Sequence, residues 1–214
     1  MSPLVLRASL IAALVAPLVL PANTARAQHL VNTTLITNLP APVLLDTTGM
    51  FQAKFARLGD DIFIGGQPTA KALHELKAQG VTVVVNLRTP EEMKSAVKFD
   101  EPALIQELGM RYVYIPMRGN AEFPYSPDAV AKFAEAVRSA NGKVLLHCTI
   151  AWRASHLWAA YLIKERGVPV ETALGNARAI NLMDTMRMGT SGRQPVEAFL
   201  NQSLPAVGHP PTSP

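Results

Sequence analysis

The chain has 214 residues, the length of a single domain of ordinary size. Hydrophobic residues make up 49% of it, as in chains that bury a core, so the composition excludes an intrinsically disordered protein. The formal net charge of +4 comes from basic residues scattered among acidic ones, without the run or stripe of Lys and Arg typical of nucleic-acid binding, so no nucleic-acid partner is expected.

The first 27 residues are predicted to be a secretory signal peptide. Arg7 precedes an apolar stretch of roughly 7 to 15 residues, and an A-x-A cleavage site follows at residues 25–27. Pro17 and Pro21 interrupt this stretch, which is shorter than the roughly 20 apolar residues of a membrane span, so we expect cleavage rather than an anchor. Cleavage leaves 18 Lys and Arg against 16 Asp and Glu, and predicts a periplasmic or secreted protein without stable membrane insertion.

The rest of the chain divides into three predicted regions. Residues 28–56 show no sustained apolar period and are expected to form an extended N-terminal segment. Residues 57–204 alternate apolar runs with amphipathic stretches and are expected to form the folded domain. The Pro-rich residues 205–214 cannot hold a packed element and are expected to be a disordered tail.

Strands and helices are predicted to alternate along the domain. The expected strands are the short, mainly apolar runs DDIFIGG, VTVVVNL, RYVYIP and KVLLH. The expected helices follow the capping residues Thr69, Thr89 and Asp100, start again after Ser126, and occupy most of the chain from Arg153 onward. Because each parallel return needs a right-handed crossover, this alternation implies an α/β three-layer sandwich with a mainly parallel central sheet of about four to five strands.

The single cysteine occupies a position where chemistry is expected. Cys148 directly follows the strand KVLLH and precedes a predicted helix, at the sheet edge where such folds bind ligands. A lone cysteine at a strand end is by itself more often a buried apolar residue. However, a helix N-terminus favours anions and the thiolate form of a cysteine, and the guanidinium of Arg153 matches two oxygens of a phosphate or sulfate. The sequence therefore predicts a nucleophile and an anion clamp in one loop.

Four motifs carry a resemblance to a known family. IGGQPT, VVVNLR, ELGMRYVYIP and LLHCTIAWRAS occur in an order that resembles the bacterial cysteine phosphatases of dual-specificity type, found as the phosphatase-like domain of beta-lactamase-hydrolase-like proteins. The resemblance spans residues 57–183. It implies a cysteine-phosphatase fold, with Cys148 as the nucleophile that forms a phosphocysteine intermediate and Arg153 as the phosphate-binding arginine.

Other site residues follow from the same loop and its surroundings. The residues expected to hold the phosphate are those of the loop itself, namely Thr149, Ile150, Ala151, Trp152 and Arg153. Arg88, at the end of a neighbouring strand, either approaches the anion or forms a salt bridge with Glu91 or Glu92. His147 and Ser155 are expected to support the loop, His147 either by bonding to the backbone or by polarising the loop.

The loop departs from the general pattern of tyrosine phosphatases in two ways. Four residues separate Cys148 from Arg153 instead of five, a spacing shared by the resembled subfamily and by rhodanese-type sulfurtransferases. Ala151 stands where related loops tend to have glycine, although a loop that curls around an anion often needs a positive φ angle that alanine resists. A rhodanese-like sulfurtransferase and a catalytically degenerate phosphate-binding domain therefore stay open as alternatives, and activity is expected to be weak.

The general acid is the least defined part of the predicted site. Cysteine phosphatases place an aspartate in the loop before the active-site strand, but the corresponding loop MRGNAEFPYS contains none. Glu122 is its only carboxylate and is the expected acid. Asp128 is the alternative, although its position in the first turn of the next helix already suits it to the helix dipole.

The sequence as a whole predicts an exported, cysteine-dependent phosphatase. Its partners are expected to be phosphate monoesters, borne by a phosphorylated small molecule or by a phosphoprotein. His74 and Glu75 begin like a zinc-protease motif, but no second histidine follows at the required spacing. No metal and no cofactor are therefore expected.

Overall fold

The computed structural model describes residues 39–182 and 193–205. The predicted signal peptide, the first part of the N-terminal segment at residues 28–38 and the tail at residues 206–214 lie outside the described residues. Within the described ranges, no helix is long and apolar enough to cross a membrane.

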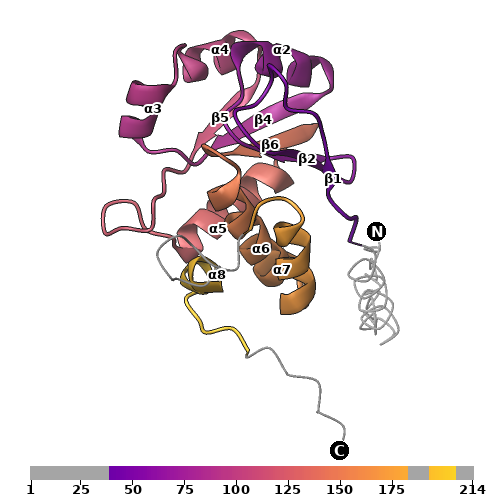
Figure 1. Cartoon of the computed structure of the whole chain (residues 1–214), viewed down its shortest axis with the longest axis vertical. Helices are drawn as coiled ribbons and strands as arrows, with labels where there is room; N and C mark the ends of the chain where they lie inside the picture. The colour runs from indigo at the N-terminus through magenta and orange to yellow at the C-terminus, as the bar shows by residue number, and fades with distance from the viewer. Residues whose placement is uncertain (1–38, 183–192, 206–214) are drawn as a thin grey trace, which may run out of the picture. The chain divides into compact units, whose positions relative to one another are not determined.

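One six-stranded sheet forms the centre of the described chain, in the order β1-β2-β3-β6-β4-β5 (Figure 1). The strands are β1 (Val43–Leu44), β2 (Phe55–Leu58), β3 (Ile62–Gly65), β4 (Val81–Asn86), β5 (Arg111–Tyr114) and β6 (Lys143–His147). Strands β3, β6, β4 and β5 are parallel, while β1 and β2 pair antiparallel at one side. The α/β fold with a mainly parallel sheet is confirmed, with more strands than expected.

The extra strands come from the segment predicted to be extended. β1 is only two residues long and β2 only four, so neither contains enough positions for an alternating apolar pattern to be recognised. β2 pairs with β3 across the turn at Gly59, whose φ of +58° lies in the left-handed region that favours glycine. The folded part therefore begins before residue 57.

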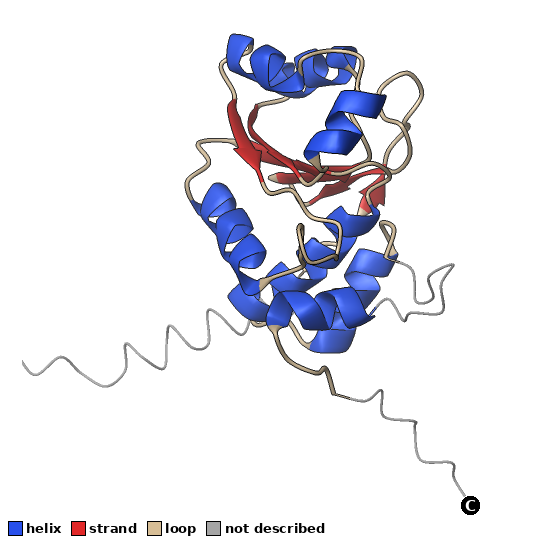
Figure 2. Cartoon of the chain, turned by 90° about the vertical axis from the view of Figure 1, so that its left-hand side faces the viewer, coloured by secondary structure: helices blue, strands red, loops and turns tan. Residues whose placement is uncertain are grey.

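Helices cover both faces of the sheet, which gives three layers (Figure 2). They are α2 (Ala70–Ala78), α3 (Pro90–Ala96), α4 (Glu101–Glu107), α5 (Pro127–Arg138), α6 (Trp152–Arg166), α7 (Val170–Arg178) and α8 (Arg193–Leu200). One hydrophobic cluster joins β3, β4 and β6 to α2 and α4, and a larger one joins the opposite face to α5, α6, α7 and α8. α6 is buried along most of its length, so its N-terminus is held firmly against the end of β6.

Side-chain caps begin the helices where the sequence predicts them. The Thr69, Asp100 and Ser126 side chains each accept a hydrogen bond from a backbone N–H in the first turn of α2, α4 and α5. At α3, Thr89 and Glu92 form a complete capping box. The predicted starts of these helices are confirmed, and the capping box fixes Glu92 near the end of β4.

The alternation of side chains along β6 decides which way the site residues face. Val144, Leu146 and Cys148 pack in the cluster with α5 and α6, whereas Leu145 packs in the cluster with α2 and α4. His147 lies on that second side, beside the first residue of α4. Neighbouring residues of the predicted site therefore face opposite sides of the sheet.

Candidate active site

The loop from β6 to α6 is held against the turn that follows β3. Cys148 is only 1% exposed, and its N–H donates to the Gly65 carbonyl at 3.3 Å. The Gln67 N–H donates to the Thr149 carbonyl at 3.0 Å. A Cβ at Gly66 would lie 2.8 Å from the Thr149 oxygen, so only glycine lets the two backbones approach this closely. These two hydrogen bonds fix the backbone of Cys148 and Thr149 against the turn after β3.

Ala151 adopts a backbone conformation that glycine takes up more readily than alanine. Its φ of 66° and ψ of −1° place it in the left-handed region, at the N-cap of α6. For a residue with a Cβ this costs about 1–2 kcal/mol, and the packing of the buried Ala151 methyl group in the core offsets part of it. The loop therefore reaches the curled backbone without glycine.

The N-terminus of α6 has no side-chain cap, unlike those of α2, α3, α4 and α5. The N–H groups of residues 152–154 in its first turn have no acceptor within the helix. Together with the positive end of the helix dipole, they make this turn a favourable position for an anion. Cys148 lies five residues before Arg153, with four residues between them.

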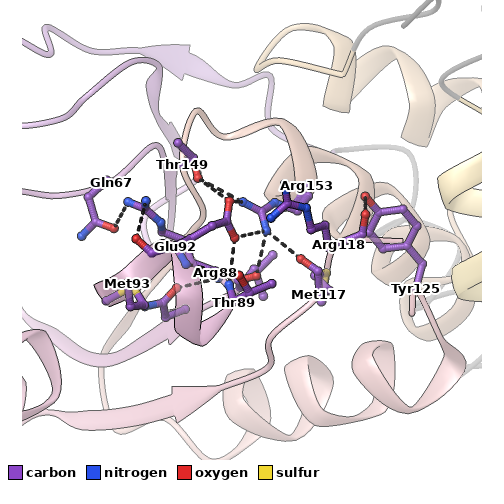
Figure 3. A network of polar contacts seen from close by, with 12 residues as sticks. Gln67, Arg88, Thr89, Glu92, Met93, Met117, Arg118, Tyr125, Thr149 and Arg153 are labelled. Atoms are coloured by element: carbon purple, nitrogen blue, oxygen red, sulfur yellow. Dashed lines mark hydrogen bonds and ion pairs between the residues drawn. The ribbon is translucent and has the colours of Figure 1, made fainter. Parts of the chain in front are cut away.

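Arg153 is 8% exposed and is hydrogen-bonded on both Nη groups (Figure 3). Nη1 donates to the Met117 carbonyl at 2.6 Å, to the Leu87 carbonyl at 3.3 Å and to Oε2 of Glu92 at 2.9 Å. Nη2 donates to Oε1 of Glu92 at 2.7 Å and to Oγ1 of Thr149 at 3.0 Å. The guanidinium thus contacts the segments that follow β4 and β5, the loop between β6 and α6, and helix α3. These contacts fix it in place before any substrate binds.

Glu92 is the counter-ion of this guanidinium. Its carboxylate also accepts the Thr89 N–H at 2.8 Å and the Thr149 hydroxyl at 3.2 Å. Partial burial alone would raise its pKa, but the hydrogen bonds from Arg153 and Thr89 and the charges of Arg153 and Arg88 lower the pKa of Glu92 to about 2. The carboxylate is therefore ionised at neutral pH, and it holds Arg153 in a two-pronged ion pair.

Arg88 lies beside this pair but bonds to other groups. Its Nη1 donates to Oε1 of Gln67 at 2.8 Å and its Nη2 to the Glu92 carbonyl at 3.1 Å, so it contacts the backbone of Glu92 rather than a carboxylate. Burial lowers the pKa of Arg88, and the charge of Glu92 opposes that effect. Its buried Nε has no hydrogen-bond partner among the described residues. A second guanidinium thus adds positive charge to the site without a direct carboxylate partner of its own.

A buried polar network lies behind the loop, on the α4 side of the sheet. Glu101 is completely buried and accepts hydrogen bonds from the Gln67 amide and, at 2.8 Å, from the Asn86 amide. Nε2 of His147 lies 3.2 Å from Oε1 of Glu101, close enough for an ion pair, although the contact lacks the angle of a hydrogen bond. Burial raises the pKa of Glu101, but His147, Gln67 and Asn86 together lower it below its ordinary value. His147 therefore contacts a carboxylate rather than the backbone.

The remaining loop residues divide into supporting and exposed ones. The Ser155 hydroxyl donates to the Ala151 carbonyl at 2.8 Å, which ties the first turn of α6 to the loop. The Asn181 amide donates to the Ile150 carbonyl at 2.6 Å. Ile150 itself is 44% exposed and Trp152 is partly buried, so the outer surface of the loop is apolar.

The two carboxylates considered as general acid do not take part in this network. Glu122 and Asp128 are both exposed, and neither carboxylate has a hydrogen bond or ion pair to another described residue. The side chain of their loop that does join the network is Tyr125, whose hydroxyl donates to the Arg118 carbonyl at 3.3 Å (Figure 3).

Several residues of the site were not predicted from the sequence. Glu92 was recognised as a helix cap but not as the partner of Arg153, and Glu101, Gln67 and Asn86 were not recognised at all. Asn86 ends β4, Glu101 begins α4 and Gln67 lies in the turn after β3, which is the signal that could have identified them. No group of three or more His, Cys, Asp or Glu side chains in the described part of the chain is arranged to hold a metal ion.

Comparison with known proteins finds one matching family. The family model described as a DSP-PTPase phosphatase fused to NAD+ kinase matches residues 32–193, three-quarters of the chain. A beta-lactamase hydrolase-like protein of Xylella fastidiosa is 27% identical over 132 residues, which cover 60% of this chain and 30% of that protein. The chain thus matches less than a third of the length of this relative.

Solved structures share the fold. P. aeruginosa TpbA aligns with a TM-score of 0.51 at 18% identity, covering 77% of this chain and 91% of that one. A phosphatase of the DUF442 group from Shewanella putrefaciens aligns with a TM-score of 0.50 at 23% identity, covering 79% and 97%. At these identities the likeness is one of fold.

Proposed function

The chain belongs to the dual-specificity phosphatase family of the matching model, a family of phosphoric monoester hydrolases, and from this we propose that it acts through a phosphocysteine on Cys148. The observation that carries the proposal is that Cys148 lies within electrostatic reach of the Arg153 guanidinium, in the loop that leads to the uncapped N-terminus of α6. A thiol, a two-pronged cation and free helix N–H groups at one turn are what transfer of a phosphoryl group to sulfur needs.

The first step binds the phosphate dianion. No hydrogen bond joins Nε of Arg153 to another described residue, and one Nη2 hydrogen is held only by the Thr149 hydroxyl at 3.0 Å. A phosphate that displaces this hydroxyl therefore gains two donors from Arg153, while Glu92 keeps its hold on the rest of the guanidinium. The N–H groups of the first turn of α6 supply further donors.

The second step transfers the phosphoryl group. The Cys148 sulfur attacks phosphorus, an S–P bond forms, the P–O bond to the alcohol breaks, and the leaving oxygen takes a proton. Water then attacks phosphorus, the S–P bond breaks, and inorganic phosphate and the thiolate are released. The positive charges of Arg153, Arg88 and the α6 N-terminus favour both the thiolate and the charge that spreads over the phosphoryl oxygens.

An assay of two group-transfer reactions tests this function. The purified protein should release phosphate from an aryl phosphate and should form no thiocyanate from thiosulfate and cyanide. Turnover of phosphate esters is expected to be slow, because Cys148 is 1% exposed and substrate must open a path to it. Thiocyanate formation without phosphate release would instead assign the site to sulfur transfer, and binding of phosphate without either reaction would assign it to a non-catalytic domain.

We also propose that the phosphatase acts outside the cytoplasm, on a phosphorylated small molecule or a phosphoprotein. The support is the leader with Arg7, the apolar stretch and the A-x-A site at residues 25–27. Amino-terminal sequencing of the protein from the extracytoplasmic fraction should give Gln28 as the first residue. Full-length chain in the membrane fraction would contradict this proposal without affecting the assignment of the catalytic residues.

A further inference from the structure

A tyrosine, rather than a carboxylate, extends into the polar network from the loop after β5. Arg153 donates to the Met117 carbonyl at 2.6 Å, and the Tyr125 hydroxyl donates to the next carbonyl, that of Arg118, at 3.3 Å. Two consecutive peptide groups thus hold the guanidinium and the phenol. Figure 3 shows Tyr125 at the Arg153 end of the network.

The loop is folded around the ring of Tyr125. Gly119 has a φ of +80°, and a Cβ there would lie 2.5 Å from the ring, so the loop closes on the tyrosine only because this residue is glycine. The Arg118 and Gly119 N–H groups both donate to the Phe123 carbonyl at 2.8 Å. The ring also packs on Phe199 of α8, with 5.0 Å between centroids. The hydroxyl therefore has a fixed position.

The charges around the hydroxyl are those of the catalytic loop. Burial raises the pKa of Tyr125 to about 12; Arg153 and Arg118 act against this, and Glu92 and an ionised Cys148 act with it. These groups come from α6, the loop of Tyr125 itself, α3 and the end of β6. The hydroxyl is therefore protonated across the working range of pH and lies within electrostatic reach of Arg153 and Cys148.

We propose that the Tyr125 hydroxyl is the acid that protonates the leaving oxygen, an inference that rests on the proposed phosphatase function. As sulfur attacks and the P–O bond breaks, the phenolic proton passes to the leaving oxygen. Tyr125 is left as a phenolate near Arg153 and Arg118. In the second step the phenolate takes a proton from the attacking water as the S–P bond breaks, which restores the hydroxyl.

A phenol, which is a weaker acid than a carboxylic acid, suits one class of leaving group. A phenol transfers its proton readily to an alkoxide leaving group, because the alkoxide is a stronger base. It accelerates the departure of a stabilised phenolate very little, because such a leaving group can depart without a proton. Glu122 and Asp128, the carboxylates nearby in the sequence, are exposed and have no contact with the network in the described chain. The substrate class that the site fits is therefore an alkyl phosphate monoester.

The test compares two substrates in the Tyr125→Phe variant of the full protein. We expect kcat/KM for an alkyl phosphate such as glycerol phosphate to fall roughly 100-fold, and kcat/KM for 2,4-dinitrophenyl phosphate to fall less than about threefold. kcat/KM is chosen because it reports the steps up to formation of the phosphocysteine. Equal melting temperatures of variant and wild type establish that the fold is retained.

Two control variants separate this role from others. Tyr114→Phe removes a hydroxyl from another tyrosine, at the end of β5, and Glu122→Gln removes the rival acid of the same loop; both should keep the wild-type rates on both substrates. Equal losses on the two substrates in Tyr125→Phe, or a selective loss in Glu122→Gln, would overturn the proposal. Absence of turnover of either substrate by the wild type would contradict the phosphatase function itself, a result distinct from these.

Discussion

Replacing Cys148 with serine should abolish phosphate release while leaving phosphate binding intact. The hydroxyl is a far weaker nucleophile than a thiolate, and no other thiol is available because Cys148 is the sole cysteine. The donors that hold the anion, Arg153 and the first turn of α6, do not depend on the sulfur. Turnover is measured with an aryl phosphate and binding by calorimetry with phosphate and vanadate.

Arg153→Ala should behave differently from the serine variant. In the proposed mechanism the guanidinium contacts the bound phosphate and also the charge that develops in the transition state, so its loss should weaken phosphate binding and lower kcat together, kcat by roughly 10²–10³-fold. Arg153→Lys should recover only part of both, because an ammonium cannot replace a two-pronged donor. Arg138→Ala is the matched control, since that arginine is exposed on α5 and pairs only with surface glutamates. Full activity in Cys148→Ser, or unchanged phosphate affinity in Arg153→Ala, would place the active site elsewhere.

Local signals in the sequence predicted the elements that carry the site, because each depends on residues close together in the chain. The capping box of Thr89 and Glu92 spans three residues, and β4 and β6 are continuous runs of apolar side chains. Strands β1 and β2 were not predicted, since strands this short are specified by their pairing, β1 with β2 and β2 with β3, rather than by their own pattern.

The pairings within the site were harder to predict because they join distant segments. Glu92 contacts Arg153 across 61 positions of the chain, so its sequence neighbours identify only its role as a cap. Tyr125 lies in the loop where a carboxylic acid was expected, and its contact with the Arg118 carbonyl leaves no pattern in the sequence. Backbone preference alone favours glycine at position 151, whereas tertiary packing holds the alanine at positive φ.

Glu92→Gln should destabilise the fold and show what the ion pair with Arg153 contributes. Arg153 is largely buried, so removing its counter-ion leaves a charge with incomplete compensation, at a cost of about 3 kcal/mol in the free energy of unfolding. Glu91→Gln is the matched control: Glu91 occupies the same first turn of α3 but is exposed, so its loss should cost less than about 1 kcal/mol. Urea unfolding at neutral pH measures both variants, and equal effects in the two would mean that Glu92 acts only through the helix dipole.

The same variant should change how stability depends on acid. The folded-state pKa of Glu92 is lowered to about 2 from an ordinary value of 4.5, so its contribution is fully present above pH 4.5 and is lost as pH falls toward 2. The pair then gives the wild type an advantage over Glu92→Gln on the order of 3 kcal/mol at pH 6, and much less at pH 3 or below. Glu101, whose pKa is also lowered, titrates in both proteins, so the difference between them isolates Glu92. A difference in unfolding free energy that stays constant from pH 6 to pH 3 would show that a neutral carboxyl group holds Arg153 equally well, and that the charge of the pair is not what stabilises the site.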